Sequence, residues 1–248
     1  MRTGKIINTA LLAFVLGLFS FQTSSFKNAQ LKNSRVKVAY QQKWPGLKHL
    51  LETKGIPEGE LDLFLRIFKK EGVLEAWGKR HRDKDYGLLK SFAICSRSGV
   101  LGPKRRQGDY QVPEGFYDIA VFQPFSNYHL ALKVSYPNKS DILNAKGKNP
   151  GGDIMIHGNC VTIGCIPIQD DPIEELYVLA VEAKNQGCAI PVYIFPFKFT
   201  ADFAPANAET IQFWKTLQPA FEYFETNHRL PLISVNKLGE YVLNSALR

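Results

Sequence analysis

A histidine and a cysteine eight residues apart could together perform nucleophilic chemistry. His157 follows the short apolar run 154–156 and precedes Gly158, and Cys165 follows Gly164. A thiol attacks a carbonyl carbon as the thiolate, and a neighbouring imidazole that takes its proton is the usual way to form one at neutral pH. Glycine beside each residue permits tight turns and lets a substrate carbonyl approach main-chain N–H groups that would hold an oxyanion. The spacing therefore predicts acyl transfer through a cysteine nucleophile.

The remaining cysteines leave alternatives open. Cys160 lies between His157 and Cys165, so the three side chains could ligate a metal, although the motif lacks the tight cysteine pair and the fourth ligand typical of zinc sites. A Cys160–Cys165 disulfide would give a redox-active or dormant protein. The sequence also leaves open a pairing of Cys95 with Cys188. The histidines outside the motif are expected either on the surface or in the core with hydrogen-bonded ring nitrogens: His49, His81, His129 and His228.

The residues around the pair resemble the signature of the YkuD-like L,D-transpeptidases, in the YafK-like branch with a short His-to-Cys interval. Thr162-Ile163-Gly164-Cys165 matches the Ser-x-Gly-Cys form of the motif, with Thr162 keeping the hydroxyl of the usual serine. Ile163 replaces a second, non-catalytic histidine of the family. Three further segments agree with the same branch: 98–104, 108–117 and 135–138. The matching segments lie between about residues 70 and 200, more than half of the chain.

The resemblance implies that Cys165 attacks the carbonyl on the L side of a peptide bond in a peptidoglycan stem, after the third residue, and forms a thioester. His157 would take the thiol proton, and Gly158 would orient the imidazole through its carbonyl. The thioester would pass to an amine in transpeptidation or to water in carboxypeptidase or endopeptidase action. No metal and no cofactor is implied. The oxyanion hole and the substrate contacts would come from the Cys165 amide and the loop before it: Thr162, Ile163 and Gly164.

Peptidoglycan is the expected partner, and a wall-attached protein is a second class of substrate. The formal net charge of +8 suits an anionic polymer or a membrane surface, and equally an ordinary basic soluble protein. The basic run 104–106 is short and flanked by glycine turns, so no nucleic acid is expected as a partner. A non-catalytic wall-binding module and a thiol-redox protein are the competing hypotheses. Four basic side chains could bind substrate carboxylates: Arg97, Lys104, Arg105 and Arg106.

Residues 1–25 have the pattern of a targeting segment. A short basic head precedes the apolar run 6–21, which is typical of a secretory signal peptide. Residues 21–25 contain no clean Ala-x-Ala cleavage site, so an uncleaved N-terminal anchor in contact with the membrane is the alternative. Either reading predicts export to the periplasm or the cell envelope.

The elements that must position the pair are expected between residues 72 and 199, the L,D-transpeptidase-like catalytic domain. Short apolar runs separated by turn residues predict strands there: 73–77, 88–95, 115–122, 128–135 and 189–197. After the motif, Asp171 and Glu174 predict a capping box at a helix start. The buried stripe of this helix would be Ile173, Leu176, Tyr177, Ala180 and Val181. We therefore expect an α+β, mostly β fold: an L,D-transpeptidase-like β-sandwich or barrel with flanking helices and a C-terminal helical extension.

The flanking segments carry weaker patterns. Residues 26–45 are polar and are expected to be a linker before an N-terminal helical region, 46–71. In that region Leu61, Phe64, Leu65 and Phe68 recur at the spacing of one buried helix face. Residues 200–248 are expected to pack on the domain as a C-terminal extension, with a helix broken at Pro219 and final strands. This extension would cover an open sheet edge rather than shape the cleft.

Overall fold

The computed structural model describes residues 25–200 and 206–244. Its helices are α1 (Phe26–Gln30), α2 (Ser34–Thr53), α3 (Lys139–Asn144), α4 (Asp170–Asn185) and α5 (Ala208–Asn227). Its strands are β1 (Leu61–Phe68), β2 (Val73–Arg80), β3 (Gly87–Ala93), β4 (Gly115–Gln123), β5 (Ala131–Val134), β6 (Met155–His157), β7 (Ile166–Pro167), β8 (Pro191–Phe195), β9 (Leu232–Val235) and β10 (Tyr241–Asn244).

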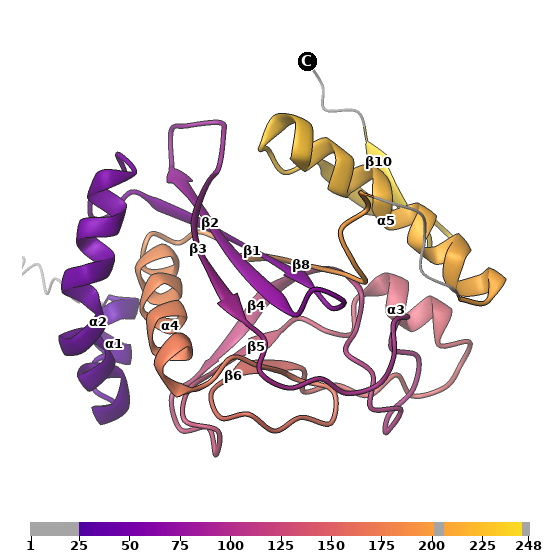
Figure 1. Ribbon diagram of the computed structural model, residues 1–248, viewed down its shortest axis with the longest axis horizontal. Coiled ribbons are helices and arrows are strands. Elements are labelled where there is room, and N and C mark those ends of the chain that lie inside the picture. The colour runs from indigo at the N-terminus through magenta and orange to yellow at the C-terminus, as the bar shows by residue number, and fades with distance from the viewer. Residues whose placement is uncertain (1–24, 201–205, 245–248) are drawn as a thin grey trace, which may run out of the picture.

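One eight-stranded mixed sheet forms the centre of the fold, in the order β3-β2-β1-β8-β4-β5-β6-β7 (Figure 1). β1 runs parallel to β8, and β6 runs parallel to β7. Because β8 lies between β1 and β4, it joins the N-terminal strands to those that carry the His–Cys motif. β9 and β10 pair with each other in a second, two-stranded sheet.

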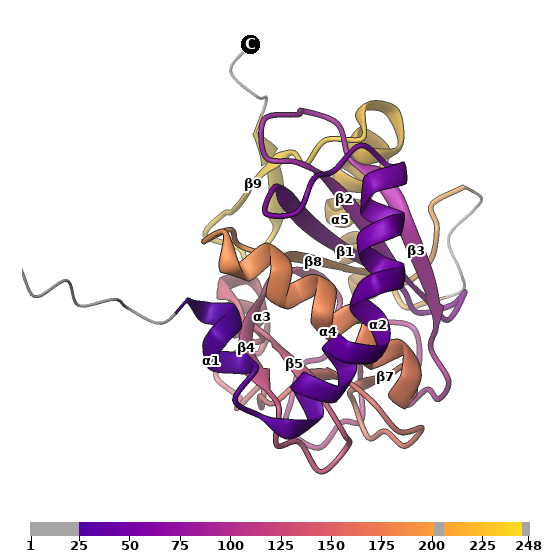
Figure 2. The same cartoon turned by 90° about the vertical axis from the view of Figure 1, so that its left-hand side faces the viewer.

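Helices cover both faces of the sheet at β1. α4 lies between α2 and the sheet, and α5 lies on the opposite side (Figures 1 and 2). Leu63, Leu65 and Ile67 belong to the aliphatic core shared with α2 and α4. Phe64 and Phe68 belong to an aromatic cluster shared with α5. Since successive side chains of a strand point to opposite faces, β1 contributes to both cores.

The predicted helix over Leu61–Phe68 is wrong, because this segment is β1. Every residue of the strand except Asp62 is buried, since helices cover its faces and β2 and β8 pair with its edges. Such a strand has a nearly continuous apolar run, which periodicity over so few residues does not distinguish from a buried helix. Leu65 therefore faces the α4 side, whereas Phe64 and Phe68 face α5.

The expected linker over residues 26–45 is also wrong, because α1 and the first part of α2 occupy it. The side chain of Asn33 caps α2 by accepting hydrogen bonds from backbone amides of the first turn, and the helix continues through Pro45. Packing of one face stabilises a helix more than local propensity does. The buried side chains of α2 lie along such a face: Val36, Ala39, Tyr40, Leu47 and Leu51.

The helix predicted after the motif is α4, and its expected stripe is buried. Its start differs from the prediction. The helix begins at Asp170 after Gln169, whose φ is +71°, and no side chain caps it. The predicted capping box is therefore wrong. Asp171 and Glu174 instead face Lys43 of α2, which forms an ion pair with Asp171 and lies 3.6 Å from the Glu174 carboxylate.

The predicted strands correspond to β2, β3, β4, β5 and β8, so the α+β fold with a β-sheet and flanking helices is confirmed. The C-terminal extension forms α5, β9 and β10. α5 runs through Pro219, so the predicted break is wrong. Packing against the sheet outweighs the backbone hydrogen bond that proline removes. α5 covers a face of the sheet rather than an edge, through aromatic and aliphatic side chains: Phe213, Trp214, Leu217, Phe221 and Phe224.

The expected leader, residues 1–25, lies outside the described residues except for Ser25, which caps α1. Among the helices that the structure describes, none is both long enough and apolar enough to span a membrane.

Candidate active site

The pairing of β6 with β7 places His157 and Cys165 on the same side of the sheet. The two strands are parallel, with Ile156 opposite Ile166, so Cys165 lies level with Met155. Neighbouring residues on paired strands point the same way, and residues two apart on one strand share a face. The side chains of positions 155, 157 and 165 therefore share a face. In agreement, two cavities are each lined by both His157 and Cys165.

The imidazole of His157 is buried and held on two sides. Its Nδ1 lies 2.5 Å from the carbonyl oxygen of Gly158. A carbonyl only accepts, so this hydrogen bond places the proton on Nδ1 and leaves Nε2 free to act as a base. The ring of Tyr128 packs beside the imidazole, with the centroids 4.8 Å apart. Burial lowers the pKa of His157 below its ordinary value, and the Gly158 carbonyl opposes only part of this effect.

The thiol of Cys165 lies 3.5 Å from the carbonyl oxygen of Asp153. Burial raises the pKa of Cys165 above its ordinary value of 9.0, and the Met155 amide and the charge of Lys104 favour the thiolate to a smaller extent. Since burial also favours the neutral form of His157, the resting pair is a thiol and a neutral imidazole. The residue types alone predict a thiolate, whereas burial favours the neutral forms of both side chains.

Thr162 closes the loop that leads to Cys165. Its hydroxyl donates to the carbonyl of Cys165 at 2.8 Å and accepts from the amide of Gly164 at 3.1 Å. The Gly164 amide, expected as an oxyanion donor, is therefore already paired. In the part of the chain that the structure describes, no acceptor is paired with the amide of Cys165. Ile163, which lies between Thr162 and Gly164, is 76% exposed at the rim of the site.

Gly158 occupies a position that excludes any side chain. A Cβ there would lie 2.5 Å from Oδ1 of Asp170 and 2.8 Å from the carbonyl oxygen of Tyr128. Asp170, the first residue of α4, also accepts a hydrogen bond from the Asn159 amide at 2.6 Å. The start of α4 thus fixes the turn that follows His157. No local sequence pattern distinguishes Asp170 or Tyr128 as residues of the site.

A disulfide joins Cys95, just after β3, to Cys160 in the loop between His157 and Cys165. The two cysteines are 65 positions apart in the sequence, and their Cα atoms are 5.6 Å apart. Cys165 and Cys188 remain free thiols. Because the Cys160 sulfur is already bonded, the alternatives of a metal site at the motif and of a Cys160–Cys165 disulfide are not present in this structure.

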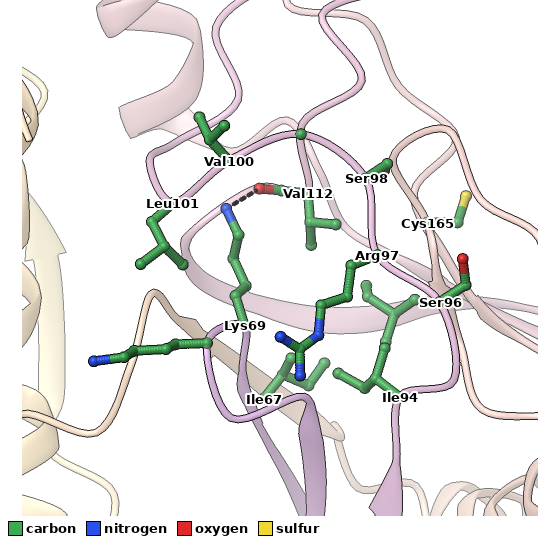
Figure 3. Close-up of a pocket in the computed structure, with 13 residues that line it drawn as sticks. Ile67, Lys69, Ile94, Ser96, Arg97, Ser98, Val100, Leu101, Val112 and Cys165 are labelled. Atoms are coloured by element: carbon green, nitrogen blue, oxygen red, sulfur yellow. Dashed lines mark hydrogen bonds between the residues drawn. The ribbon is translucent and has the colours of Figure 1, made fainter. Parts of the chain in front are cut away.

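Cys165 borders three cavities. The largest, about 580 Å³, is shared with His157 and has Tyr110, Tyr128 and Ile163 on its walls. The second, about 360 Å³, is also shared with His157. The third, about 260 Å³, borders Cys165 without His157 (Figure 3). The thiol is therefore reachable from more than one cavity.

The third cavity combines apolar walls with three cationic residues, Lys69, Lys70 and Arg97. Arg97 extends toward Ile67 and Ile94, while Cys165 lies at the margin of the view (Figure 3). The guanidinium lies against the backbone at Gly72, where an added Cβ would clash with Nη2. The Ser98 hydroxyl, also in the cavity wall, is buried and has no hydrogen-bond partner among the described residues.

The four basic side chains expected to bind carboxylates are placed differently. Arg97 and Lys104 line cavities that border the nucleophile. The ammonium of Lys104 is 2.6 Å from the carboxylate of Asp109, so its charge is already paired. Arg105 and Arg106 line none of the three cavities described above. Of these four, Arg97 is therefore the side chain best placed to meet an anionic group in a cavity beside Cys165.

A buried ion pair supports the segment 97–114, which contributes to the walls of these cavities. Nζ of Lys69 lies 2.8 Å from Glu114 and also donates to the carbonyl of Gly102. Figure 3 shows its third hydrogen bond, to the carbonyl of Val112. Glu114 is fully buried and accepts a hydrogen bond from Nε1 of Trp214 in α5 at 2.7 Å. The C-terminal extension therefore helps to shape the cleft, which the sequence had disfavoured.

Comparison with known proteins identifies the family. "Putative L,D-transpeptidase YafK" of Escherichia coli (strain K12) is 37% identical to this chain over 190 residues, 75% of each chain. The chain belongs to the L,D-transpeptidase family. The resemblance carried by the motif segments is thereby confirmed, and the same relative occurs in Escherichia coli O157:H7 with equal identity. No protein-family model matches the sequence.

Solved structures resemble this L,D-transpeptidase family member more distantly. The helical cell shape determining protein Pgp2 of Campylobacter jejuni is 20% identical, with a TM-score of 0.45, over 75% of this chain and 65% of that one. L,D-transpeptidase 1 of Mycobacterium tuberculosis is 12% identical, with a TM-score of 0.27, over 54% of this chain and 62% of that one. The chain thus spans less than two thirds of either solved protein, and the family assignment rests on the identity to YafK.

Proposed function

We propose that this protein is a cysteine-dependent acyl transferase that acts on peptidoglycan stem peptides in the periplasm or cell envelope. The observation that carries the proposal is the shared placement of His157 and Cys165 along two cavities. The family supplies the substrate class. Cys165 attacks the carbonyl carbon of the third stem residue. The amine of the fourth residue leaves, and the stem remains on sulfur as a thioester.

His157 moves the proton in this scheme. Nε2 accepts the thiol proton as the carbon–sulfur bond forms and then gives it to the leaving amine. The Gly158 carbonyl, hydrogen-bonded to Nδ1, holds the ring and stabilises the transient imidazolium, as an acidic residue does in serine hydrolases. Because burial disfavours both separated charges in the resting site, proton transfer accompanies the attack.

The oxyanion that develops on the substrate needs a donor beside the sulfur. The amide of Cys165 is the first candidate, since the amide of Gly164 is bonded to the Thr162 hydroxyl. Such a donor typically lowers the barrier by about 3 kcal/mol. Thr162 then acts as a positioning residue, since its two hydrogen bonds hold the loop on both sides of that amide.

The acceptor decides between cross-linking and hydrolysis. An amine of a second stem gives a cross-link, and water gives carboxypeptidase or endopeptidase action. The three cavities that meet at Cys165 support entry of either acceptor. A wall-attached protein, joined to a stem through an amine, belongs to the same substrate class. Export through residues 1–25, with cleavage or with retained membrane contact, is part of this proposal.

Incubation of the purified protein with a disaccharide tetrapeptide, followed by separation of the products, tests the proposal. Cross-linked dimers identify transfer, and disaccharide tripeptide alone identifies hydrolysis. Cys165→Ala should abolish both products while the protein remains folded. Full turnover by Cys165→Ala would disprove the mechanism. Peptidoglycan binding without turnover by either protein would favour a wall-binding module instead.

A further inference from the structure

A second group of chemically capable side chains lies at the other end of β1 from the candidate site. Asp62 is near the start of β1, His81 follows β2, and Cys188 lies between α4 and β8. Each offers one ligand atom, and these atoms all lie within 4.8 Å of one another. Ile67 and Lys69, at the far end of β1, line a cavity that borders Cys165.

The three ligand atoms already approach the separations that a metal ion imposes. Oδ1 of Asp62 lies 3.1 Å from Sγ of Cys188 and 3.0 Å from Nδ1 of His81. The Cys188 sulfur lies 3.8 Å from the same His81 nitrogen. Ligand atoms bound tetrahedrally to zinc at about 2.0–2.3 Å are about 3.3–3.7 Å apart. Shifts of a few tenths of an ångström would therefore bring all three atoms onto one ion.

The backbone holds these residues from three separate segments. β1 and β2 pair so that Asp62 lies opposite Lys79, and the amide of His81 donates to the carbonyl of Glu60 at 3.0 Å. β8, which follows Cys188, pairs directly with β1. Asp62 lies in β1, whereas His81 directly follows β2 and Cys188 lies in the short connection before β8. The side chain of His81 is 77% exposed, so an ion can enter from solvent.

We propose that Asp62, His81 and Cys188 bind a divalent transition metal, zinc in the first instance, with a fourth position open to water. Thiolate and imidazole ligands select zinc over magnesium and calcium, which prefer oxygen. Binding forms the metal–sulfur bond and releases the Cys188 thiol proton to solvent. The Lys79 ammonium contacts Oδ2 of Asp62, so Oδ1 remains available. Because the thiol must lose its proton to bind the ion, binding strengthens as the pH rises.

Cobalt titration of the full-length Cys165→Ala protein, without reductant, tests the site. With the Cys95–Cys160 disulfide intact, Cys188 is the free thiol that remains in this variant. We expect a thiolate-to-cobalt charge-transfer band that saturates at one equivalent and disappears when zinc is added. The band should be lost on adding Cys188→Ser and weakened on adding His81→Ala. His129→Ala, which removes a histidine paired with Glu174, should leave it unchanged.

Thermal unfolding supplies a second readout that separates binding from misfolding. Zinc at about 100 times its dissociation constant should raise the Tm of the Cys165→Ala protein by about 5–10 °C. The shift should vanish on adding Cys188→Ser, whose Tm without metal should be close to that of its parent. Lys79→Gln should increase the affinity by removing a neighbouring positive charge. Absence of the cobalt band from the Cys165→Ala protein, or its persistence without Cys188, would overturn the proposal.

Discussion

Cys95 and Cys160 are joined by a disulfide that ties the loop carrying Cys165 to the end of β3. The loop is thus held by three kinds of contact: this covalent bond, the Thr162 hydrogen bonds and the Asp170 contact at the start of α4. Placement errors of about one ångström at a reacting atom cost about two orders of magnitude in rate. These contacts should therefore affect the proposed turnover.

Removal of the disulfide should lower both stability and turnover. It spans 65 positions in the sequence, for which the chain-entropy model gives about 4 kcal/mol of stabilisation. The double variant Cys95→Ser/Cys160→Ser should lose about that much in the free energy of unfolding, measured with urea. Its kcat should fall because the loop relaxes. Cys188→Ser, which removes a free thiol, is the matched control; equal stability of the two variants would contradict the prediction.

Gly158→Ala should displace the imidazole of His157. The added Cβ would meet the Asp170 carboxylate and the Tyr128 carbonyl at 2.5 and 2.8 Å. We expect kcat to fall by about 100-fold through misplacement and the free energy of unfolding to fall by about 1–3 kcal/mol. Gly46→Ala in α2, where a Cβ meets nothing within 4 Å, should leave kcat unchanged. Normal turnover in Gly158→Ala would show that this turn is not rigid.

Thr162→Val should reduce kcat while Thr162→Ser should not. Valine keeps the shape but removes the donor to the Cys165 carbonyl and the acceptor for the Gly164 amide. Two hydrogen bonds at about 1 kcal/mol each correspond to about a 30-fold loss if both are needed in the transition state. Steady-state kinetics should show the loss in kcat rather than KM. A serine variant as slow as the valine variant would assign the effect to packing of the methyl group.

The rate of alkylation of Cys165 by iodoacetamide should show that its thiol and the imidazole of His157 are both neutral in the absence of substrate. Burial raises the pKa of Cys165 above 9.0, so the reactive thiolate is a small fraction near neutral pH. In a Cys188→Ser background, the alkylation rate should rise about tenfold per pH unit up to about pH 9. A rate that is high and independent of pH between about 6 and 8 would instead reveal a preformed thiolate–imidazolium pair.

Asp141→Asn should change how stability depends on pH. Burial raises the pKa of Asp141 to about 6 from its ordinary 3.8, so the folded protein binds this proton more tightly than the unfolded chain. The carboxyl therefore lowers the free energy of unfolding as the pH rises from 3.8 to about 6. The amide of the variant does not titrate. Relative to wild type, the variant should gain about 2 kcal/mol in the free energy of unfolding between about pH 4 and about pH 7. Urea unfolding at both pH values measures the gain; parallel pH profiles would refute it.

Local sequence patterns predicted the family, the His–Cys motif and the elements whose side-chain spacing lies within one segment. The α4 stripe and most of the strands carry side-chain spacings that their own segments specify. The same information failed at Leu61–Phe68, because burial on both faces removes the alternation that marks a strand. The sequence also failed to predict α2, because the buried face of this helix is stabilised by packing against α4.

Contacts between distant segments depend on the tertiary fold. The Cys95–Cys160 bond, the Asp170 carboxylate beside Gly158 and the Asp62–His81–Cys188 group each join residues that the topology brings together. The neutral state of the thiol and the imidazole depends on burial, which spacing does not report. Local propensities reflect neighbours within a few positions, whereas desolvation and side-chain contacts depend on what the folded chain places around each atom.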